Sequence, residues 1–473
     1  MPSLRRQQVH PRSFGILFAK ECRNLASGRA FWVLLLLLCP LVGYSFTQAV
    51  ALYAEASRSA AQLPEVAHSL SPLDGILVPT FGALYLANTL LFPFVVIRTV
   101  AHEKETGSLK LLLQLPPSIG TVLAAKIAAL AGAWALVAAP ALSAVALWAM
   151  AGGHVHLPEL AGVLLGHCLY GAVVTGFALL AAVLAESSAT AAIITLAITL
   201  GFWVIDFAAA GESGILKSLA SLSPTLLLRE FERGVVSVGS ALAALTAALG
   251  LAVVAGILLD LRGAASRKLA LLAISVIVTA LLTLAAAQLH LYGDASQDRR
   301  NSLAPADADT LSGLKQRLTV VVRLAPEDPR YIDFARNILS KLQRTMPDVR
   351  IVQESRSRTG ALEEASQNYG TIVYQYGGRQ SESRSTGTGE ILPLIYGLAQ
   401  VERKGTPAAP PYPGYPLEAS PRAAEIWFYG ALPLLILAAW ITTQGGVSCV
   451  YASNGRRSGE ARSVDEGGKP KET

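Results

Sequence analysis

The sequence predicts an α-helical polytopic membrane protein of about eight transmembrane helices, with a small α/β extracytoplasmic domain between the last two spans. The chain of 473 residues has 52% hydrophobic and only 15% charged residues, whereas soluble domains carry about 25% charge. Its apolar runs reach the roughly 20 residues that a helix needs to cross a bilayer core. A polar segment, residues 292–423, separates the last two runs. This composition excludes a soluble enzyme, a disordered scaffold and a fibrous protein.

Eight apolar segments are the predicted spans, and the third is long enough to be tilted or to begin as an interfacial helix. They lie at residues 31–52, 76–101, 120–150, 159–185, 190–209, 240–260, 269–291 and 426–447. The predicted organisation is a tail with an amphipathic helix (1–30), six spans (31–265), a seventh span (266–291), the outer domain with a proline-rich linker (292–423), an eighth span (424–450) and a tail (451–473).

Basic residues set the predicted orientation, because Lys and Arg are retained on the cytoplasmic side of a membrane. They gather in the N-terminal tail, after the second and sixth spans and in the C-terminal tail, whereas the opposite loops hold few. We therefore expect both termini in the cytoplasm and an even number of spans. The net charge of +6 is explained by this placement beside apolar runs, so no nucleic-acid partner is expected.

The segment before the first span reads as an amphipathic helix on the inner leaflet. One face holds the apolar residues Phe14, Leu17, Phe18, Cys22 and Leu25. Lys20, Arg23 and Asn24 occupy the other face. A cleaved signal peptide is the alternative, but the apolar run is long and the region before it spans about 30 residues, more than the short basic region of such a peptide.

The polar segment at 292–423 predicts a small α/β domain. RLTVVVRL, VRIVQ and GTIVYQY are rich in β-branched and aromatic residues and predict strands. YIDFARNILSKLQR and ILPLIYGLAQVE have apolar residues at helical spacing. The stretch GTPAAPPYPGYPLEASPR is too rich in proline for regular structure and reads as a stiff linker to the last span.

Motifs for catalysis and cofactors are missing from the sequence. It has no GxxxxGK[ST] phosphate loop, no HExxH, no GxSxG and no GxGxxG after a strand. The four cysteines are far apart and predict neither disulfides nor a zinc site. His154 and His156 could ligate a metal, but no third ligand is near, so a solvated loop is the favoured interpretation. We expect no cofactor and no metal.

Two ionisable residues lie in apolar surroundings, Lys126 near the inner start of the third span and Asp206 near the outer end of the fifth. Such residues are functional candidates by default. Both are close enough to a bilayer edge to extend their charges to water, and a structural role is the favoured interpretation. An intramembrane enzyme that uses Asp206 is disfavoured, because no partner residue is placed for it.

The stretch HEKETGSLKLLLQLPPS follows the second span. It predicts one helix along the membrane surface, with Leu109, Leu112 and Leu113 on an apolar face. Such a helix would offer Glu103, Lys104 and Glu105 to a soluble partner. An ordinary interfacial helix without a partner is the alternative.

This stretch resembles the E-x-E-x-G-[ST]-L-x-x-L-L-x-x-P-x-S segment of type-2 ABC exporter permeases, which couples to a separate ATPase subunit. The residues at motif positions are Glu103, Glu105, Thr106, Gly107, Leu109 and Pro116. Lys104 lies between the two acids, and His102 replaces the usual charged residue before them. The resemblance implies that these residues couple the chain to an ATPase.

Two further segments resemble gliding-motility-type ABC proteins. LSPTLLLREFERGVV is similar to a permease loop that forms short re-entrant helices, and it brings in Ser223, Pro224, Phe231 and Gly234. DASQDRRNSLAPADADT is similar to the start of the auxiliary subunit, although Ala304 replaces the common Ser or Thr. The chain thus resembles a six-span permease fused to a shortened auxiliary domain.

The resemblance implies the membrane subunit of an ABC-type exporter in the bacterial cytoplasmic (inner) membrane. Two ATPase copies would pair with a homodimer, or with this chain and a second permease, and the chain itself would supply no catalytic residue. The alternative is an ATP-driven mechanical or assembly component whose outer domain binds an envelope protein. The sequence does not identify the substrate, since an apolar path could pass a lipid, a peptide or a drug.

Overall fold

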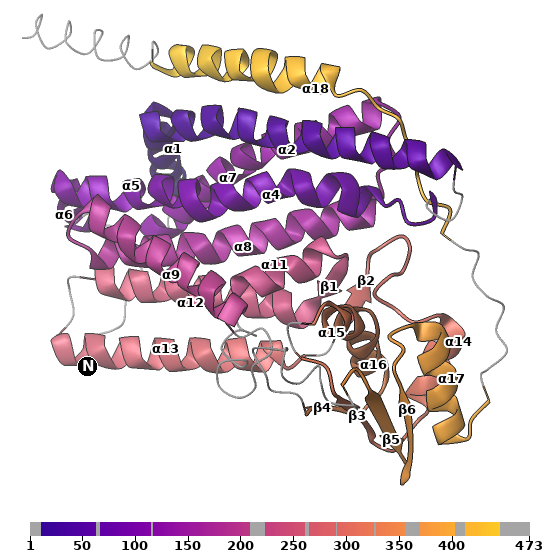
Figure 1. Cartoon of the computed structure of the whole chain (residues 1–473). Helices are drawn as coiled ribbons and strands as arrows, with labels where there is room; N and C mark the ends of the chain where they lie inside the picture. The colour runs from indigo at the N-terminus through magenta and orange to yellow at the C-terminus, as the bar shows by residue number, and fades with distance from the viewer. Residues whose placement is uncertain are drawn as a thin grey trace, which may run out of the picture.

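The apolar runs form long helices in the computed structural model (Figure 1). It describes residues 11–62, 67–114, 117–208, 223–260, 264–289, 291–325, 328–354, 369–402 and 412–444. Within these ranges, eight helices are long and apolar enough to cross a membrane. Each of the eight predicted segments forms one of them, so this part of the fold prediction is confirmed.

The eight helices run side by side, and α1 (Pro11–Ser27) precedes them (Figure 1). They are α2 (Arg29–Gln62), the helix that runs from η1 (Leu73–Leu77) through α4 (Val78–Leu86) and η2 (Ala87–Leu91) to α5 (Phe92–Glu105), α7 (Ile119–Met150), α8 (Leu157–Leu184), α9 (Ser188–Ala208), α12 (Val238–Leu259), α13 (Ala265–Ala287) and the helix Arg422–Gln444, which starts with α18 (Arg422–Ile426). We call the end with α1 the inner end and the end with the α/β domain the outer end, after the predicted orientation.

Two of the long helices contain π-helical turns that are explained by proline. The turns η1, η2 and η4 (Trp427–Ala431) each end two residues before a proline, namely Pro79, Pro93 and Pro433. Proline has no N–H to donate to the preceding turn, and its ring pushes against the carbonyl there. The helix widens locally instead of breaking.

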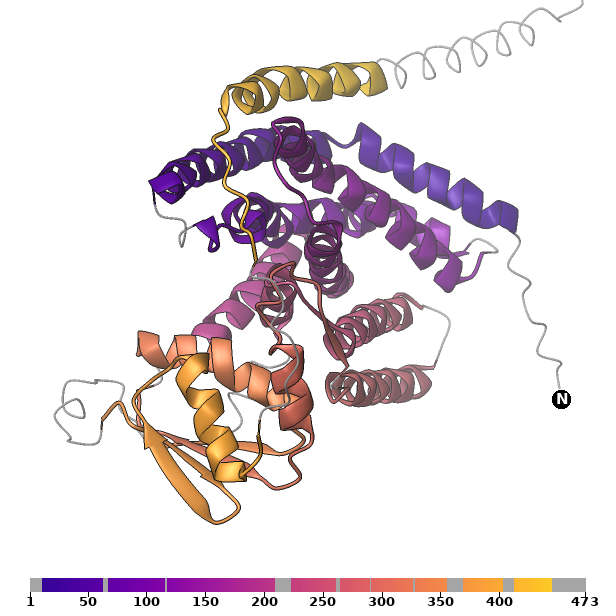
Figure 2. The same cartoon turned by 90° about the vertical axis from the view of Figure 1, so that its right-hand side faces the viewer.

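The core of the bundle lies between α2, α4–α5, α7 and α8. Leu38, Val42, Phe81, Ala141 and Val163 are 0% exposed. The window that defines the second span is 67% buried, whereas those of α13 and of the last helix are 6% buried. Figure 2 shows the last helix and the α12–α13 pair on opposite sides of the bundle. Apolar helix surfaces left so open are stable only against lipid or another protein.

A short helix, α11 (Pro224–Glu232), packs against α8 at the outer end of the bundle. Phe231 is 0% exposed, and a Cβ atom placed on Gly166 of α8 would lie 2.5 Å from the Cβ atom of Phe231. The two helices can therefore approach this closely only because residue 166 is a glycine. After α11, β1 (Val235–Ser237) pairs antiparallel with β2 (Tyr292–Asp294), which joins this helix to the start of the α/β domain.

The α/β domain is a four-stranded sheet with helices against one face (Figure 1). The strand order is β4 (Val349–Gln353), β3 (Leu318–Val322), β5 (Ile372–Tyr376) and β6 (Arg379–Ser383), with only the β3–β4 pair parallel. The helices are α14 (Pro305–Ser312), the continuous run α15 (Pro329–Phe334), η3 (Ala335–Leu339) and α16 (Ser340–Thr345), and α17 (Thr388–Ala399).

The alternation of β-branched residues explains the central strands. Leu318, Val320 and Val322 are 0% exposed and face the helices, where they pack with Ile338 and Ile395. The three predicted strands and the two predicted helices are all present. The sequence interpretation missed β6 and α14. Strand β6 lies at the edge of the sheet, and its sequence, RQSES, has no apolar residue that would predict a strand.

The prediction of a linker without regular structure holds for residues 412–421, which form neither helix nor strand; residues 403–411 lie outside the described part. The segment is nevertheless bound to the bundle. The backbone N–H of Tyr415 donates to the carbonyl of Leu70 (3.2 Å), and the hydroxyl of Tyr53 donates to the carbonyl of Tyr415 (2.8 Å). The backbone N–H of Leu417 donates to Ser57 Oγ (2.9 Å). We call residues 412–421 the outer strap.

The close contact between α8 and α11 predicts opposite effects for two glycine substitutions. Gly166→Ala should lower the thermal stability of the purified protein in detergent, because overpacking costs about 1–3 kcal/mol. Gly132→Ala in α7 is the matched control, since its Cβ atom would meet no atom within 4 Å. Alanine is about 1 kcal/mol more favourable than glycine in a helix, so the control should unfold at the same or a higher temperature. The reverse order would contradict the packing described here.

Candidate functional site

Four charged side chains meet at the inner end of the bundle. Lys126 of α7 is 1% exposed, and its Nζ atom donates to Glu21 Oε1 of α1 (3.0 Å) and to the carbonyl of Thr99 in α5 (2.9 Å). Nζ also lies 2.8 Å from Glu103 Oε2. Lys20 of α1 binds the other oxygen of Glu103 and lies 3.2 Å from Glu21. We call Lys20, Glu21, Glu103 and Lys126 the inner ion cluster.

The inner ion cluster has two positive and two negative charges, so it is neutral as a unit. Moving a charge from water into a protein interior is costly, and the cost is offset only when partners surround the charge. The cluster therefore ties α1, α5 and α7 together. Burial lowers the pKa of Lys20, but the hydrogen bond to Glu103 and the charges of Glu103 and Glu21 more than offset this, so its pKa lies above the ordinary value.

Glu103 does not face outward, and the prediction that it is offered to a partner is wrong. Glu103 is 5% exposed and its carboxylate points into the bundle, toward Lys126 and Lys20. The two ammonium groups attract this carboxylate, and turning it inward supplies the negative charge that the buried Lys126 requires. Of the three predicted docking residues, only Glu105 is exposed.

Lys104 and Glu105 contact the connection between α8 and α9 instead. The ammonium group of Lys104 donates to the carbonyls of Ala182, Val183 and Ala185 at the end of α8, at 3.2, 2.9 and 2.6 Å. These carbonyls have no partner within the helix, and a cation is favourable there. Glu105 accepts a hydrogen bond from the backbone N–H of Ser188 at the start of α9 (3.4 Å).

A sharp turn separates α5 from α6 (Ser108–Gln114), so the single helix expected over this stretch is replaced by two. Gly107 has φ of +72°, a left-handed conformation that side chains with a Cβ atom rarely adopt. The hydroxyl of Thr106 donates to the carbonyl of His102 (2.9 Å) and strengthens the turn. Pro116 lies outside the described residues.

Helix α6 is amphipathic, as predicted. Leu109, Leu112 and Leu113 are buried, whereas Leu111 is 67% exposed. Exposed leucine and the exposed carboxylate of Glu105 thus lie on neighbouring segments at the inner end.

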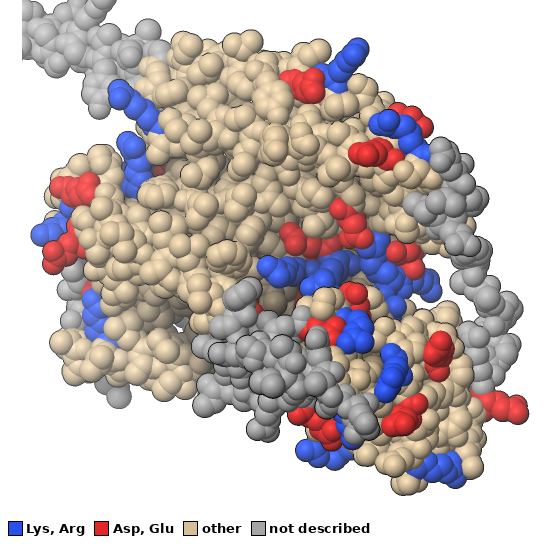
Figure 3. Space-filling model, in the orientation of Figure 1, with Lys and Arg blue, Asp and Glu red and all other residues tan. Residues whose placement is uncertain are grey.

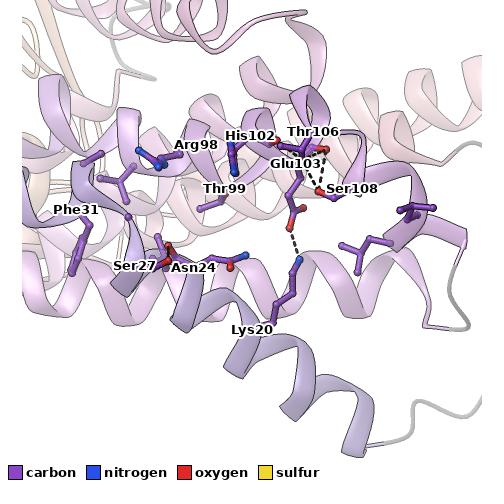
Figure 4. Close-up of a pocket in the computed structure, with 16 residues that line it drawn as sticks. Lys20, Asn24, Ser27, Phe31, Arg98, Thr99, His102, Glu103, Thr106 and Ser108 are labelled. Atoms are coloured by element: carbon purple, nitrogen blue, oxygen red, sulfur yellow. Dashed lines mark hydrogen bonds and ion pairs between the residues drawn. The ribbon is translucent and has the colours of Figure 1, made fainter. Parts of the chain in front are cut away.

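A cavity of about 510 Å³ lies between α1, α5 and α6. Figure 4 shows Lys20 of α1 and Glu103 of α5 pointing toward one another across it. Asn24, Arg98 and His102 provide other polar groups, and Phe31, Leu111 and Leu112 provide apolar walls. Its lining contains no paired nucleophile and base, so the arrangement suits binding rather than a reaction.

The predicted outer-loop residues hold α11 in place. Ser223 accepts from the backbone N–H of Thr225 (3.3 Å) as the N-cap of α11, and its hydroxyl donates to Asp206 Oδ2 (2.8 Å). Pro224 is the first residue of the helix, where its missing N–H costs nothing. Gly234 ends this turn with φ of +81°. A short helix is therefore present as predicted, although residues 209–222 lie outside the described part.

Two features of the outer end were not predicted from the sequence. His167 of α8 is 0% exposed, and its Nε2 atom lies 3.4 Å from Glu232 Oε1 of α11. His154, considered above as a metal ligand, stacks on Tyr415 of the outer strap with ring centres 3.7 Å apart. Its Nε2 atom lies 2.8 Å from Gln297 Oε1. Among the described residues, no group of three or more His, Cys, Asp and Glu side chains could hold a metal ion.

Comparison of the chain with protein-family models, with curated proteins and with solved structures finds no match. The functional assignment therefore rests on the residues and on their arrangement.

The inner ion cluster predicts that the cost of removing a lysine depends on how deeply that lysine is buried. Lys126→Met leaves two buried carboxylates with one lysine and should cost about 3–5 kcal/mol of stability. Lys20→Met should cost less, about 1 kcal/mol or under, because the Lys20 side chain is 39% exposed. Thermal unfolding in detergent measures both.

A double substitution tests whether charge balance is the cause. Adding Glu103→Gln to Lys126→Met leaves Lys20 and Glu21 as a neutral pair, so the double variant should be more stable than the sum of the two single losses predicts. Additive losses would show that the four residues do not act as one cluster.

Proposed function

We propose that this chain is the membrane-spanning permease subunit of an ABC-type exporter, with ATP hydrolysis in a separate subunit. The observation that carries the proposal is the inner-end corner formed by α5 and α6. Its sequence resembles the ATPase-coupling segment of type-2 ABC exporter permeases, and its exposed surface includes Glu105 and Leu111. The eight apolar helices agree with a multi-pass membrane protein.

Three sets of contacts connect this corner to the rest of the bundle. Glu103 is bound to Lys126 of α7 and to Lys20 of α1, and Lys104 is bound to the end of α8. Movement of the corner by a partner would therefore be transmitted from α5 to α1, α7 and α8 at once. ATP bound to the ATPase subunit would stabilise one of two arrangements of the helix bundle. A ligand shifts such an equilibrium only when it binds the two states unequally.

A second candidate function is mechanical or assembly work at the envelope, in which the α/β domain binds an envelope protein. The pairing of β1 with β2 supports this second function, because this sheet joins α11 directly to the α/β domain. Motion of α11 would then be passed to the outer domain. Stoichiometric crosslinking of the outer domain to one envelope protein favours this function, whereas substrate accumulation in a deletion strain favours export.

The proposed function predicts a phosphate-loop ATPase as partner, which would be sought in the reading frames beside this gene and co-expressed with this chain. Co-expression should give a complex whose ATPase activity depends on this chain. Glu105→Lys with Leu111→Asp should lower that activity at least tenfold, because both substitutions alter exposed atoms at the corner. Glu103 is unsuitable for this test, since reversing its charge would disrupt the inner ion cluster.

A matched control separates docking from folding. Asp333→Lys with Val401→Asp makes the same chemical changes at exposed positions of the α/β domain and should leave the ATPase activity unchanged. Both double variants should remain monodisperse in detergent. If the wild-type chain binds no phosphate-loop ATPase, or if both variants behave alike, the proposed function is wrong.

A further inference from the structure

Five basic residues converge where the helix bundle meets the α/β domain. Figure 3 shows a band of Lys and Arg side chains between the two parts. Arg229 lies in α11 and Arg233 directly follows this helix, and from η3 and α16 come Arg336, Lys341 and Arg344. We call these five residues the basic junction.

Specific contacts hold part of the basic junction in place. Asn301 donates from Nδ2 to the carbonyl of Arg233 (2.7 Å), and Arg344 Nη1 donates to the carbonyl of Asn301 (3.4 Å). The hydroxyl of Tyr292 in β2 donates to the carbonyl of Arg344 (3.1 Å). The guanidinium group of Arg344 also lies 5.4 Å from the centre of the Tyr292 ring, a cation–π distance. Segments distant in sequence are thus held together with their positive charges side by side.

Acids act on the basic junction from a distance: Asp206 attracts Arg229, Glu230 attracts Arg233, and Asp294 and Asp298 attract Lys341. None of its five side chains forms an ion pair within the described part of the chain. Two of these acids also accept hydrogen bonds from neutral hydroxyl groups, Glu230 from Ser240 (3.0 Å) and Asp294 from Ser302 (2.8 Å).

Burial, and after it the neighbouring charges, shift the pKa of Arg233. Arg233 keeps surface open to solvent although many protein atoms surround it. This burial, together with the positive charges of Arg336, Arg229 and Arg344, lowers the pKa of Arg233 below its ordinary value. An anion bound between these positive charges would reduce their mutual repulsion and so stabilise the cluster.

The surroundings indicate which kind of anion would bind. The junction adjoins the outer end of α13, where Leu281 and Leu284 are exposed, and Leu291, just before β2, is exposed as well. An apolar cavity of about 330 Å³ between α8, α12 and α13 reaches Leu284, within one turn of the end of α13. A hydrocarbon chain fits against this apolar helix, and guanidinium groups bind phosphate oxygens in pairs.

We propose that the basic junction binds the phosphate group of an anionic lipid whose hydrocarbon chain lies along α13. The site lies at the opposite end of the bundle from the α5–α6 corner. It requires no ATPase, so it can exist whether or not the chain is an exporter.

The proposal is tested with the full-length protein in detergent, by native mass spectrometry and thermal unfolding with added lipid. Phosphatidylglycerol should bind and raise the unfolding temperature, whereas phosphatidylcholine should do neither at the same concentration. Arg233→Gln with Arg336→Gln should lower phosphatidylglycerol binding at least fivefold. Without lipid this variant should be at least as stable as the wild type, because the substitutions remove repulsion.

Arg350→Gln with Arg422→Gln is the matched control, since it removes two exposed arginines outside the junction and should bind phosphatidylglycerol like the wild type. Equal binding by all three proteins would overturn the proposal. Inorganic phosphate that stabilises the wild type as strongly as the lipid would also overturn it, because the site would then hold a small anion. Polyglutamate with the same effect would point to an acidic protein partner and would overturn it too.

Discussion

Lys126 carries its charge inside an apolar bundle, and the inner half of the structure depends on how that charge is compensated. The ammonium group is surrounded by Glu21, Glu103 and the carbonyl of Thr99. These groups come from α1 and α5, so neither helix can leave α7 without exposing an unpaired charge to an apolar environment. The same constraint turns Glu103 inward and leaves Glu105 and α6 as the exposed part of the corner.

The two ends of the bundle are held by different kinds of interaction. The inner end is joined by charge, through the ion cluster and through Lys104 on the carbonyls of α8. The outer end is joined by close packing and backbone hydrogen bonds, through Phe231 on Gly166, the β1–β2 pair and the outer strap. A partner that acts at the inner corner therefore meets a connected set of helices, and α11 is placed to pass their movement to the α/β domain.

One of the two least buried helices, α13, lies near the basic junction. Helix α13 is apolar yet almost entirely open, and the basic junction lies beyond its outer end. Each feature would be unfavourable for an isolated protein in water. An anionic lipid is apolar along its chain and negative at its headgroup. It would therefore cover the apolar surface of α13 and compensate the positive charges of the basic junction.

The sequence by itself determined the eight long helices, the amphipathic α1 and the central strands of the α/β domain. Each depends on residues within about 20 positions, since helix length and apolar periodicity are local properties. Only the tertiary structure decided that Glu21 would meet Lys126, 105 residues away, that Phe231 would seat on Gly166, and that arginines of α11 and α16 would form one junction. The residue type determines the charge and the shape of a side chain. The residue that the side chain contacts depends on how helices distant in the chain pack together.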